Sequence, residues 1–133
     1  MLVLGATGRA AQSAVPLLAR QEEIGRIMMA GRDLAAVDAR RAELGVDAIT
    51  VQVDATDEAQ VADAALNCDL VLNLAGLDHA TPISGARGAL AAGCQYVDIG
   101  ASATAVLTLL GWTDEFEAAG LACLPSIGLC LER

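Results

Sequence analysis

Aromatic residues are nearly absent from this chain. Its 133 residues include one Trp, one Tyr and one Phe, so aromatics make up 2% of a sequence that is 55% hydrophobic. The core must therefore be filled by Ala, Val, Leu and Ile, which is typical of a parallel sheet covered by helices. The length fits one domain that can bury a core of substantial size.

Lysine is absent altogether, and positive charge is scarce. The chain has 8 basic and 17 acidic residues and a formal net charge of −9. Nucleic acids and anionic membrane surfaces are bound by basic faces, so the composition argues against both as partners. An anionic small molecule stays compatible with this charge if the protein meets its charge locally.

Long apolar runs and clusters of metal ligands are also missing. No apolar segment reaches the ~18 residues of a membrane span, and no charged region precedes the apolar N-terminus. We therefore expect a soluble, cytoplasmic protein. The single histidine and the absence of C-x-x-C spacing predict neither a metal site nor a disulfide scaffold, and we expect reduced, mostly buried thiols. The cysteines are Cys68, Cys94, Cys123 and Cys130.

Short apolar segments alternate with segments of helical length along the whole chain. This pattern predicts an α/β fold, a three-layer Rossmann-type doubly wound parallel sheet of about six strands in the order 3-2-1-4-5-6. Asp33 is expected to cap the second helix and Gly45 to end it, Thr81 to cap the fourth, and Thr113 or Asp114 to cap the fifth. The strands are expected at residues 1–4, 26–31, 48–54, 69–76, 95–100 and 121–128.

A glycine-rich turn follows the first apolar segment. In "VLGATGRAA", Gly5 allows a tight turn, Gly8 allows a pyrophosphate to approach the backbone, and Ala11 allows the next helix to pack closely on the sheet. That helix would direct free N–H groups at the phosphates. The turn therefore predicts dinucleotide binding, with a purely structural turn as the alternative. No lysine follows the second glycine, which disfavours a nucleoside triphosphatase loop.

The end of the second strand bears on the choice of cofactor. An acidic residue at this position would hold the ribose 2′-hydroxyl of NAD, whereas Gly31 and Arg32 offer space and a positive charge. The sequence therefore favours NADP over NAD. In the alternative interpretation, Arg32 is a solvated loop residue and Asp33 only a helix cap.

Two further strand ends are expected at the same site. Asp54 and Ala55 follow the third strand, where the adenine would lie. Asn73, Ala75 and Gly76 follow the fourth strand, beside the nicotinamide ribose. Asn73 can equally well be bonding the backbone of its own loop.

With these residues in place, the chain resembles the NAD(P)-binding domain of saccharopine dehydrogenase-like oxidoreductases. The resemblance rests on "VLGATGRAA", "AGRD", "CDLVLNLAG", "ALAAGCQYVDIG" and "LPSIGLC", and it covers nearly the whole chain. It implies that the cofactor is held by Arg32, by the end of the fourth strand and by Gly5, Ala6, Thr7, Gly8, Arg9 and Ala10.

The same resemblance implies that a second domain supplies substrate recognition and much of the chemistry. Since family members continue beyond "IGLC", residues 1–133 are expected to form a cofactor domain truncated before a C-terminal substrate domain. Apolar surface left uncovered near "LCLER" and Trp112 then predicts a homodimer. Asp98 is a candidate wall of the substrate cleft or a support for a loop, and His79 is a candidate acid or base or a plain loop residue.

We therefore expect the NADP-binding domain of an oxidoreductase, which positions the nicotinamide for hydride transfer to or from a small molecule. The alternatives are a module that binds or senses a dinucleotide without turning it over, and a structural fragment without a ligand. The sequence identifies neither catalytic residues nor the substrate. It contains no Tyr-x-x-x-Lys pair, because it has no lysine.

Overall fold

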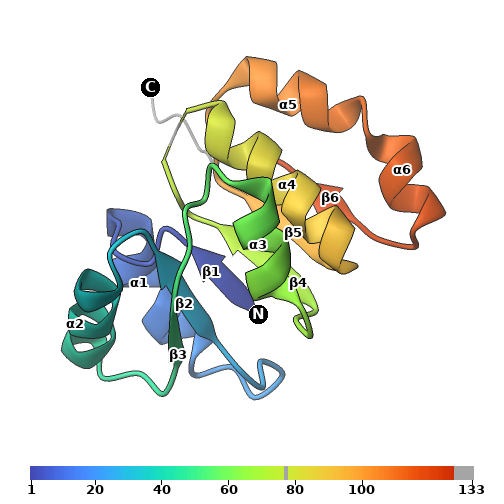
Figure 1. The fold of residues 1–133 in the computed structure, drawn as a ribbon. Helices are drawn as coiled ribbons and strands as arrows, with labels where there is room; N and C mark the ends of the chain where they lie inside the picture. The colour runs from blue at the N-terminus through green and yellow to red at the C-terminus, as the bar shows by residue number, and fades with distance from the viewer. Residues whose placement is uncertain (77, 128–133) are drawn as a thin grey trace.

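The structure is a computed structural model that describes residues 1–76 and 78–127. Within these residues, a single sheet has six strands in the order β3-β2-β1-β4-β5-β6, and all its pairs are parallel. The predicted fold and strand order are therefore confirmed (Figure 1). The strands are β1 (Leu2–Leu4), β2 (Met28–Gly31), β3 (Ile49–Gln52), β4 (Leu70–Asn73), β5 (Gln95–Asp98) and β6 (Cys123–Leu124). The helices are α1 (Arg9–Leu18), α2 (Leu34–Leu44), α3 (Glu58–Ala65), α4 (Ala80–Ala92), α5 (Ala103–Leu110) and α6 (Thr113–Ala118).

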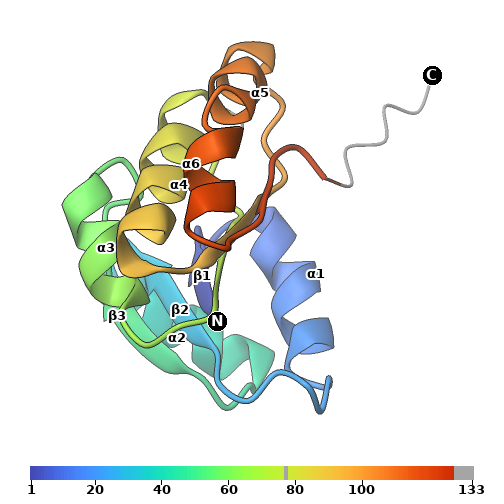
Figure 2. The same cartoon turned by 90° about the vertical axis from the view of Figure 1, so that its right-hand side faces the viewer.

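Helices cover both faces of the sheet and form the outer two of three layers. Figure 2 shows α1 on one side of the sheet and α3, α4 and α6 on the other. Side chains alternate between the faces along each strand, and in β1 Leu2 and Leu4 join one core cluster while Val3 joins the other. Small aliphatic side chains dominate both clusters, as the composition requires.

The caps of α2 are as predicted. The carboxylate of Asp33 accepts a hydrogen bond from the Ala36 amide at 3.2 Å. Gly45 follows the helix with a φ of 63°, a left-handed conformation that glycine adopts without steric cost. Residues adjacent to α2 in sequence therefore set where this helix begins and ends.

The predicted cap of α4 is wrong. The helix begins at Ala80, and the Asp78 carboxylate accepts hydrogen bonds from the amides of Ala80 and Thr81, each at 3.1 Å. The Thr81 hydroxyl is used elsewhere, since it donates to the carbonyl of Ala75. An ionised carboxylate at a helix N-terminus also benefits from the helix dipole, which favours Asp78 in this role.

The region between β5 and α6 contains α5, which the sequence interpretation missed. Its hydrophobic sequence "ATAVLTLL" has no charged residue to mark an outer face, and Ser102 accepts a hydrogen bond from the Ala105 amide as its N-cap. The predicted cap of α6 by Thr113 or Asp114 is also wrong. Trp112 occupies the N-cap position, and the Thr113 hydroxyl donates back to the Leu110 carbonyl at 2.7 Å.

Trp112 is half-buried, and Arg87 covers part of its ring. The guanidinium carbon lies 3.8 Å from the ring centroid, and the same guanidinium pairs with Glu115 at 2.6 Å. The apolar surface expected at Trp112 is thus partly covered within the domain, while "LCLER" lies outside the described residues. The homodimer stays a prediction.

Two expected absences concern the described residues alone. None of their helices is long and apolar enough to cross a membrane. Cys68, Cys94 and Cys123 carry free thiols, whereas Cys130 lies outside the described residues.

Candidate functional site

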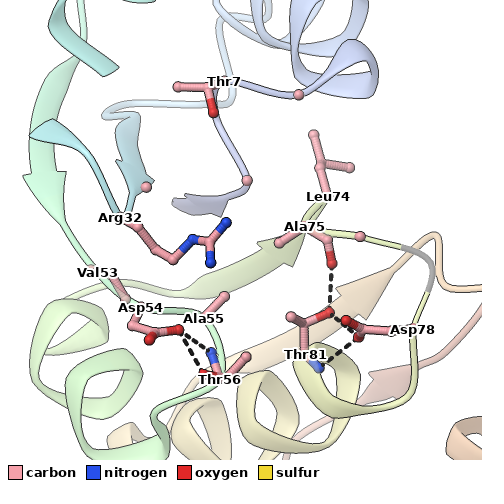
Figure 3. Close-up of a pocket in the computed structure, with 14 residues that line it drawn as sticks. Thr7, Arg32, Val53, Asp54, Ala55, Thr56, Leu74, Ala75, Asp78 and Thr81 are labelled. Carbon is pink, nitrogen blue, oxygen red and sulfur yellow. Dashed lines mark hydrogen bonds between the residues drawn. The ribbon is translucent and has the colours of Figure 1, made fainter. Parts of the chain in front are cut away.

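The carboxyl ends of β1, β2, β3 and β4 meet at a cavity of about 310 Å³ (Figure 3). Ligands of doubly wound sheets bind at this edge, where the strand order reverses beside the first strand. The lining residues are Gly5, Thr7, Gly8, Gly31, Arg32, Val53, Asp54, Ala55, Thr56, Leu74, Ala75, Gly76, Asp78 and Thr81.

The two glycines of the first turn have different reasons to be glycine. Gly5 has a φ of 74°, and a Cβ there would lie 2.5 Å from the backbone Cα of Ala75. The fold therefore requires glycine at position 5. Gly8 has an ordinary extended backbone (φ −78°, ψ 172°), and its Cβ would meet only the Gly5 carbonyl at 3.3 Å and the Leu74 carbonyl at 3.9 Å. A shift of a few tenths of an ångström would accommodate a side chain at position 8.

Gly8 is also the N-cap of α1, so no side chain bonds the first amides of this helix. Amides in the first turn of a helix have no partner within the helix. The Gly8 carbonyl, in contrast, accepts hydrogen bonds from the Arg40 guanidinium at 3.2 Å and the Gln12 amide at 3.3 Å. Hydrogen bonds to the Gly8 carbonyl thus fix the turn, while the first amides of α1 have no side-chain cap.

Arg32 is exposed and follows β2. Figure 3 shows its guanidinium pointing toward the middle of the cavity. Gln52 donates a hydrogen bond to the Arg32 carbonyl at 2.9 Å, which holds the backbone of the strand tip. Within the described part of the chain, the Arg32 guanidinium forms no ion pair, so its charge is available to a ligand.

Asp54 follows β3, and in Figure 3 the Arg32 side chain lies between it and Thr7. Its Oδ1 accepts hydrogen bonds from the Thr56 hydroxyl at 2.7 Å and the Thr56 amide at 2.9 Å. These bonds, together with the charge of Arg32, hold the pKa of the Asp54 carboxyl below its usual value. Asp54 is therefore an ionised hydrogen-bond acceptor beside the cavity, and its own amide is bonded to the Gln60 side chain.

Asn73 ends β4 but does not line the cavity. It is buried, its Nδ2 donates to the Tyr96 hydroxyl at 3.0 Å, and its Oδ1 accepts from the Ala75 amide at 2.9 Å. The Thr81 hydroxyl bonds the Ala75 carbonyl from the other side. Asn73 and Thr81 together fix the backbone of Ala75 at the cavity wall.

Tyr96 and Asp98 extend this buried network along β5. Burial and the neighbouring Asp98 carboxylate raise the pKa of the Tyr96 hydroxyl above its ordinary value. Asp98 Oδ1 accepts hydrogen bonds from the amides of Gly100 and Ser126, each at 2.8 Å. Its Oδ2 is buried and has no partner among the described residues. Asp98 thus ties the loop after β5 to the turn after β6.

The structure brings eight of the twelve candidate residues together around the cavity. They are Gly5, Thr7, Gly8, Arg32, Asp54, Ala55, Ala75 and Gly76. Ala6 is buried, Arg9 is exposed, Ala10 packs against a core cluster and Asn73 supports Ala75, so none of these four lines it. His79 is exposed and also lies outside the lining.

Six lining residues were absent from the set of candidates: Gly31, Val53, Thr56, Leu74, Asp78 and Thr81. Gly31 was recognised only as a neighbour of Arg32. Thr56 follows Asp54 by two residues, a spacing typical of a carboxylate that bonds its own loop, and this signal could have identified it. Val53 and Leu74 are buried strand-end residues that sequence alone cannot distinguish from core.

Residues 1–124 match the family described as the saccharopine dehydrogenase NADP binding domain. The chain belongs to this family. The match confirms the resemblance stated from the sequence, and a family of NADP-binding domains agrees with the prediction of NADP from Gly31 and Arg32. No curated protein sequence matches the chain significantly.

Solved structures share the fold of this family member. A saccharopine dehydrogenase (L-Glu forming) from Saccharomyces cerevisiae has a TM-score of 0.78 and 24% identity over 96% of this chain. The match covers 27% of the yeast chain, so the present chain spans about a quarter of that enzyme's length. A short chain dehydrogenase/reductase family protein has a TM-score of 0.64 and 27% identity over 93% of this chain and 71% of its own. An NADPH-dependent quinone oxidoreductase from Escherichia coli, complexed with NADPH, has a TM-score of 0.59 and 22% identity over 73% of this chain and 35% of its own.

Proposed function

We propose that this chain binds NADP(H) in the cavity at the carboxyl ends of β1 to β4 and serves as the cofactor-binding part of an oxidoreductase. The observation that carries the proposal is Gly8. Its backbone conformation is open to any residue and it has nearly enough room for a side chain, yet it stands at an uncapped helix terminus beside the cavity. The fold does not require glycine at position 8, and the absence of a side chain there leaves room for a ligand to reach the backbone.

Each part of the dinucleotide has candidate partners around the cavity. The pyrophosphate is assigned to the turn at Gly8 and the first amides of α1, because a helix N-terminus attracts anions. The 2′-phosphate is assigned to Arg32, whose guanidinium can form charge-assisted hydrogen bonds with it. Asp54 is assigned to the adenine, and Ala75 and Gly76 to the nicotinamide ribose.

This assignment explains how a chain with a net charge of −9 can bind an anion. Backbone amides meet the pyrophosphate, and one unpaired guanidinium meets the 2′-phosphate. The Thr56 bonds hold Oδ1 of the acidic Asp54 to its own loop. Local groups at the cavity thus outweigh the overall charge.

The bound nicotinamide would supply hydride transfer, while the chain holds and orients the cofactor. We propose that residues 1–133 form this cofactor domain and that a second domain binds the small-molecule substrate. We propose that this second domain also supplies much of the chemistry.

Calorimetric titration of NADPH, NADP, NADH and NAD into the 133-residue chain tests the cofactor assignment. We expect NADPH to bind about tenfold tighter than NADH at low salt, which corresponds to one charge-assisted contact of about 1.4 kcal/mol. Because Arg32 is exposed, this preference should shrink as the salt concentration rises. Absence of binding by all four dinucleotides would contradict the proposed function. Tight binding without hydride exchange in a longer protein would instead favour a sensing module.

A further inference from the structure

Gly31, the last residue of β2, is glycine for a different reason from Gly5. Its φ is not in the left-handed region, so its backbone conformation is open to any residue. A Cβ at position 31, however, would lie 2.8 Å from Cγ2 of Val37. This separation is shorter than real Cβ contacts, so either the backbone or Val37 would have to shift. The side chain of Val37 is therefore what keeps position 31 without a side chain.

Val37 is poorly placed to move aside. It is completely buried in the core cluster between the sheet and the helices α1 and α2. A β-branched side chain in a helix has one strongly preferred χ1 rotamer, so rotation would cost energy as well as packing. Its helix is fixed at the start by the Asp33 cap and farther along by the bond from Arg40 to the Gly8 carbonyl.

The blocked position is the one that distinguishes the two cofactors. In dinucleotide-binding folds, an acidic residue about twenty residues beyond the glycine turn holds the ribose 2′-hydroxyl of NAD. Position 31 borders the cavity at that point of the chain, and the next residue is the unpaired Arg32. We propose that Val37 is a specificity-determining residue: by excluding a side chain at position 31, it excludes the acid that would select NAD and leaves the strand tip to Arg32 and a 2′-phosphate. The proposal rests on the assignment of this cavity to NADP(H).

A mutant cycle followed by thermal unfolding without ligand tests the steric part. Gly31→Ala should lower the Tm by roughly 5–10 °C, because it inserts a methyl group into a packed site. When Val37→Ala is already present, the same substitution should lower the Tm by less than half as much, since both Cγ atoms are gone. Val15→Ala is the matched control: it removes the same atoms from a fully buried valine of the same cluster that does not face Gly31. With Val15→Ala, Gly31→Ala should retain its full effect.

The specificity part is tested by titrating NADPH and NADH into the variant Gly31→Asp/Val37→Ala. With room for the carboxylate, the ratio of NADPH to NADH affinity should fall at least tenfold from that of the unmodified chain, because the acid repels a 2′-phosphate and accepts the ribose hydroxyls. The double variant should melt at a higher temperature than the added losses of Gly31→Asp and Val37→Ala predict, because Val37→Ala relieves the clash at position 31.

Three outcomes would overturn the proposal. Equal effects of Gly31→Ala with and without Val37→Ala would show that Val37 is not the obstacle. A Gly31→Asp chain as stable as the unmodified one and selective for NADH would show that no obstacle exists. An unchanged cofactor ratio in the double variant would show that position 31 does not select. If the unmodified chain bound neither dinucleotide, the proposed function would fail, whereas the melting cycle would still report the coupling of Gly31 and Val37.

Discussion

The carboxyl ends of β1 and β2 differ sharply from those of β4 and β5, although all four belong to one sheet edge. At the ends of β1 and β2 and directly after them, the chain has glycines at positions 5, 8 and 31, a helix terminus without a side-chain cap and a guanidinium that pairs with none of the described residues. β4 and β5 themselves carry buried polar side chains that bond neighbouring protein groups, namely Asn73, Tyr96 and Asp98, and Thr81 at the start of α4 does the same.

This difference points to separate roles for the two halves of the edge, one in contacting a ligand and one in supporting the cavity wall. Polar groups that already have partners gain little from a ligand, whereas uncapped amides and an unpaired charge gain hydrogen bonds from one. We therefore infer that the first half of the sheet edge contacts the charged parts of the cofactor. The second half holds the backbone of the cavity wall in place. Each of the following substitutions should act on one half and leave the other half's property unchanged.

The largest effect is expected from Gly8→Asp. It would place a carboxylate at the proposed pyrophosphate site, and opposed like charges cost several kcal/mol, so NADPH affinity should fall by at least about 100-fold. The backbone of Gly8 is compatible with a side chain, so circular dichroism should show an unchanged fold with a small change in Tm. Gly25→Asp is the control, because Gly25 is exposed and a Cβ there meets nothing within 4 Å. Equal NADPH affinity of the two variants would remove the turn from the site.

Asp98→Ala should have the opposite profile. It removes the acceptor for the Gly100 and Ser126 amides, and the loss of two hydrogen bonds to a charged group should reduce the free energy of unfolding by roughly 2–3 kcal/mol. Urea denaturation would measure this loss, and Asp98→Asn should recover at least half of it, because its Oδ1 can accept the same bonds. NADPH affinity of the folded variant should change less than about threefold. A contact worth about 1.4 kcal/mol would change it tenfold. A large loss of affinity with little loss of stability would move Asp98 into the cofactor site.

Arg32→Ala should have a moderate effect on cofactor choice alone. The preference for NADPH over NADH, about tenfold in the unmodified chain, should fall to about one, because both ligands then lack a cationic partner at the strand tip. Arg20→Ala removes the same charge from an exposed residue outside the cavity lining and is the matched control. Titration at low salt gives the comparison. A preference that survives in Arg32→Ala would assign the 2′-phosphate to another residue.

The half of the edge that we propose to contact the cofactor was easier to recognise from sequence than the half that supports the cavity wall. Gly5, Gly8 and Arg32 follow strands at spacings that are local properties of the chain, and Asp33 and Gly45 mark the ends of α2 by their own chemistry. The six strands were recognisable because buried parallel strands are short apolar runs between helical segments. Their order followed from the repeated alternation of strand and helix.

The supporting half depends on contacts between distant residues. Asn73 bonds Tyr96 across 23 positions, and Asp98 bonds Ser126 across 28. The first half also contains such a contact, because Arg40 reaches the Gly8 carbonyl across 32 positions. The close approach of position 31 to Val37 is local in sequence, but it requires the packing of α2 on the sheet. Spacing along one chain does not encode such pairs. α5 was missed for a different reason, because this hydrophobic helix has no charged residue and only Thr104 and Thr108 mark its polar face.

The smallest effect is a dependence of stability on alkaline pH, and it sharpens the supporting role of Tyr96. Burial and the Asp98 charge raise the pKa of the folded Tyr96 hydroxyl, and burial raises the pKa of the Cys123 thiol to about 11. Above the unfolded-state values, near 10 for tyrosine, the unfolded chain has lost protons that the folded chain still binds. Stability is therefore fully present below those values and falls as the pH rises.

Tyr96→Phe removes the tyrosine contribution and leaves the thiols unchanged. At pH 8 the variant should be less stable by about 1 kcal/mol, because it lacks the bond to Asn73. At pH 11 the unmodified chain should have lost about 1.4 kcal/mol through Tyr96, so the two stabilities should nearly coincide. Urea denaturation of both proteins at pH 8, 9, 10 and 11 measures this convergence, and a constant difference would show that the Tyr96 hydroxyl is not protected from ionisation by the fold.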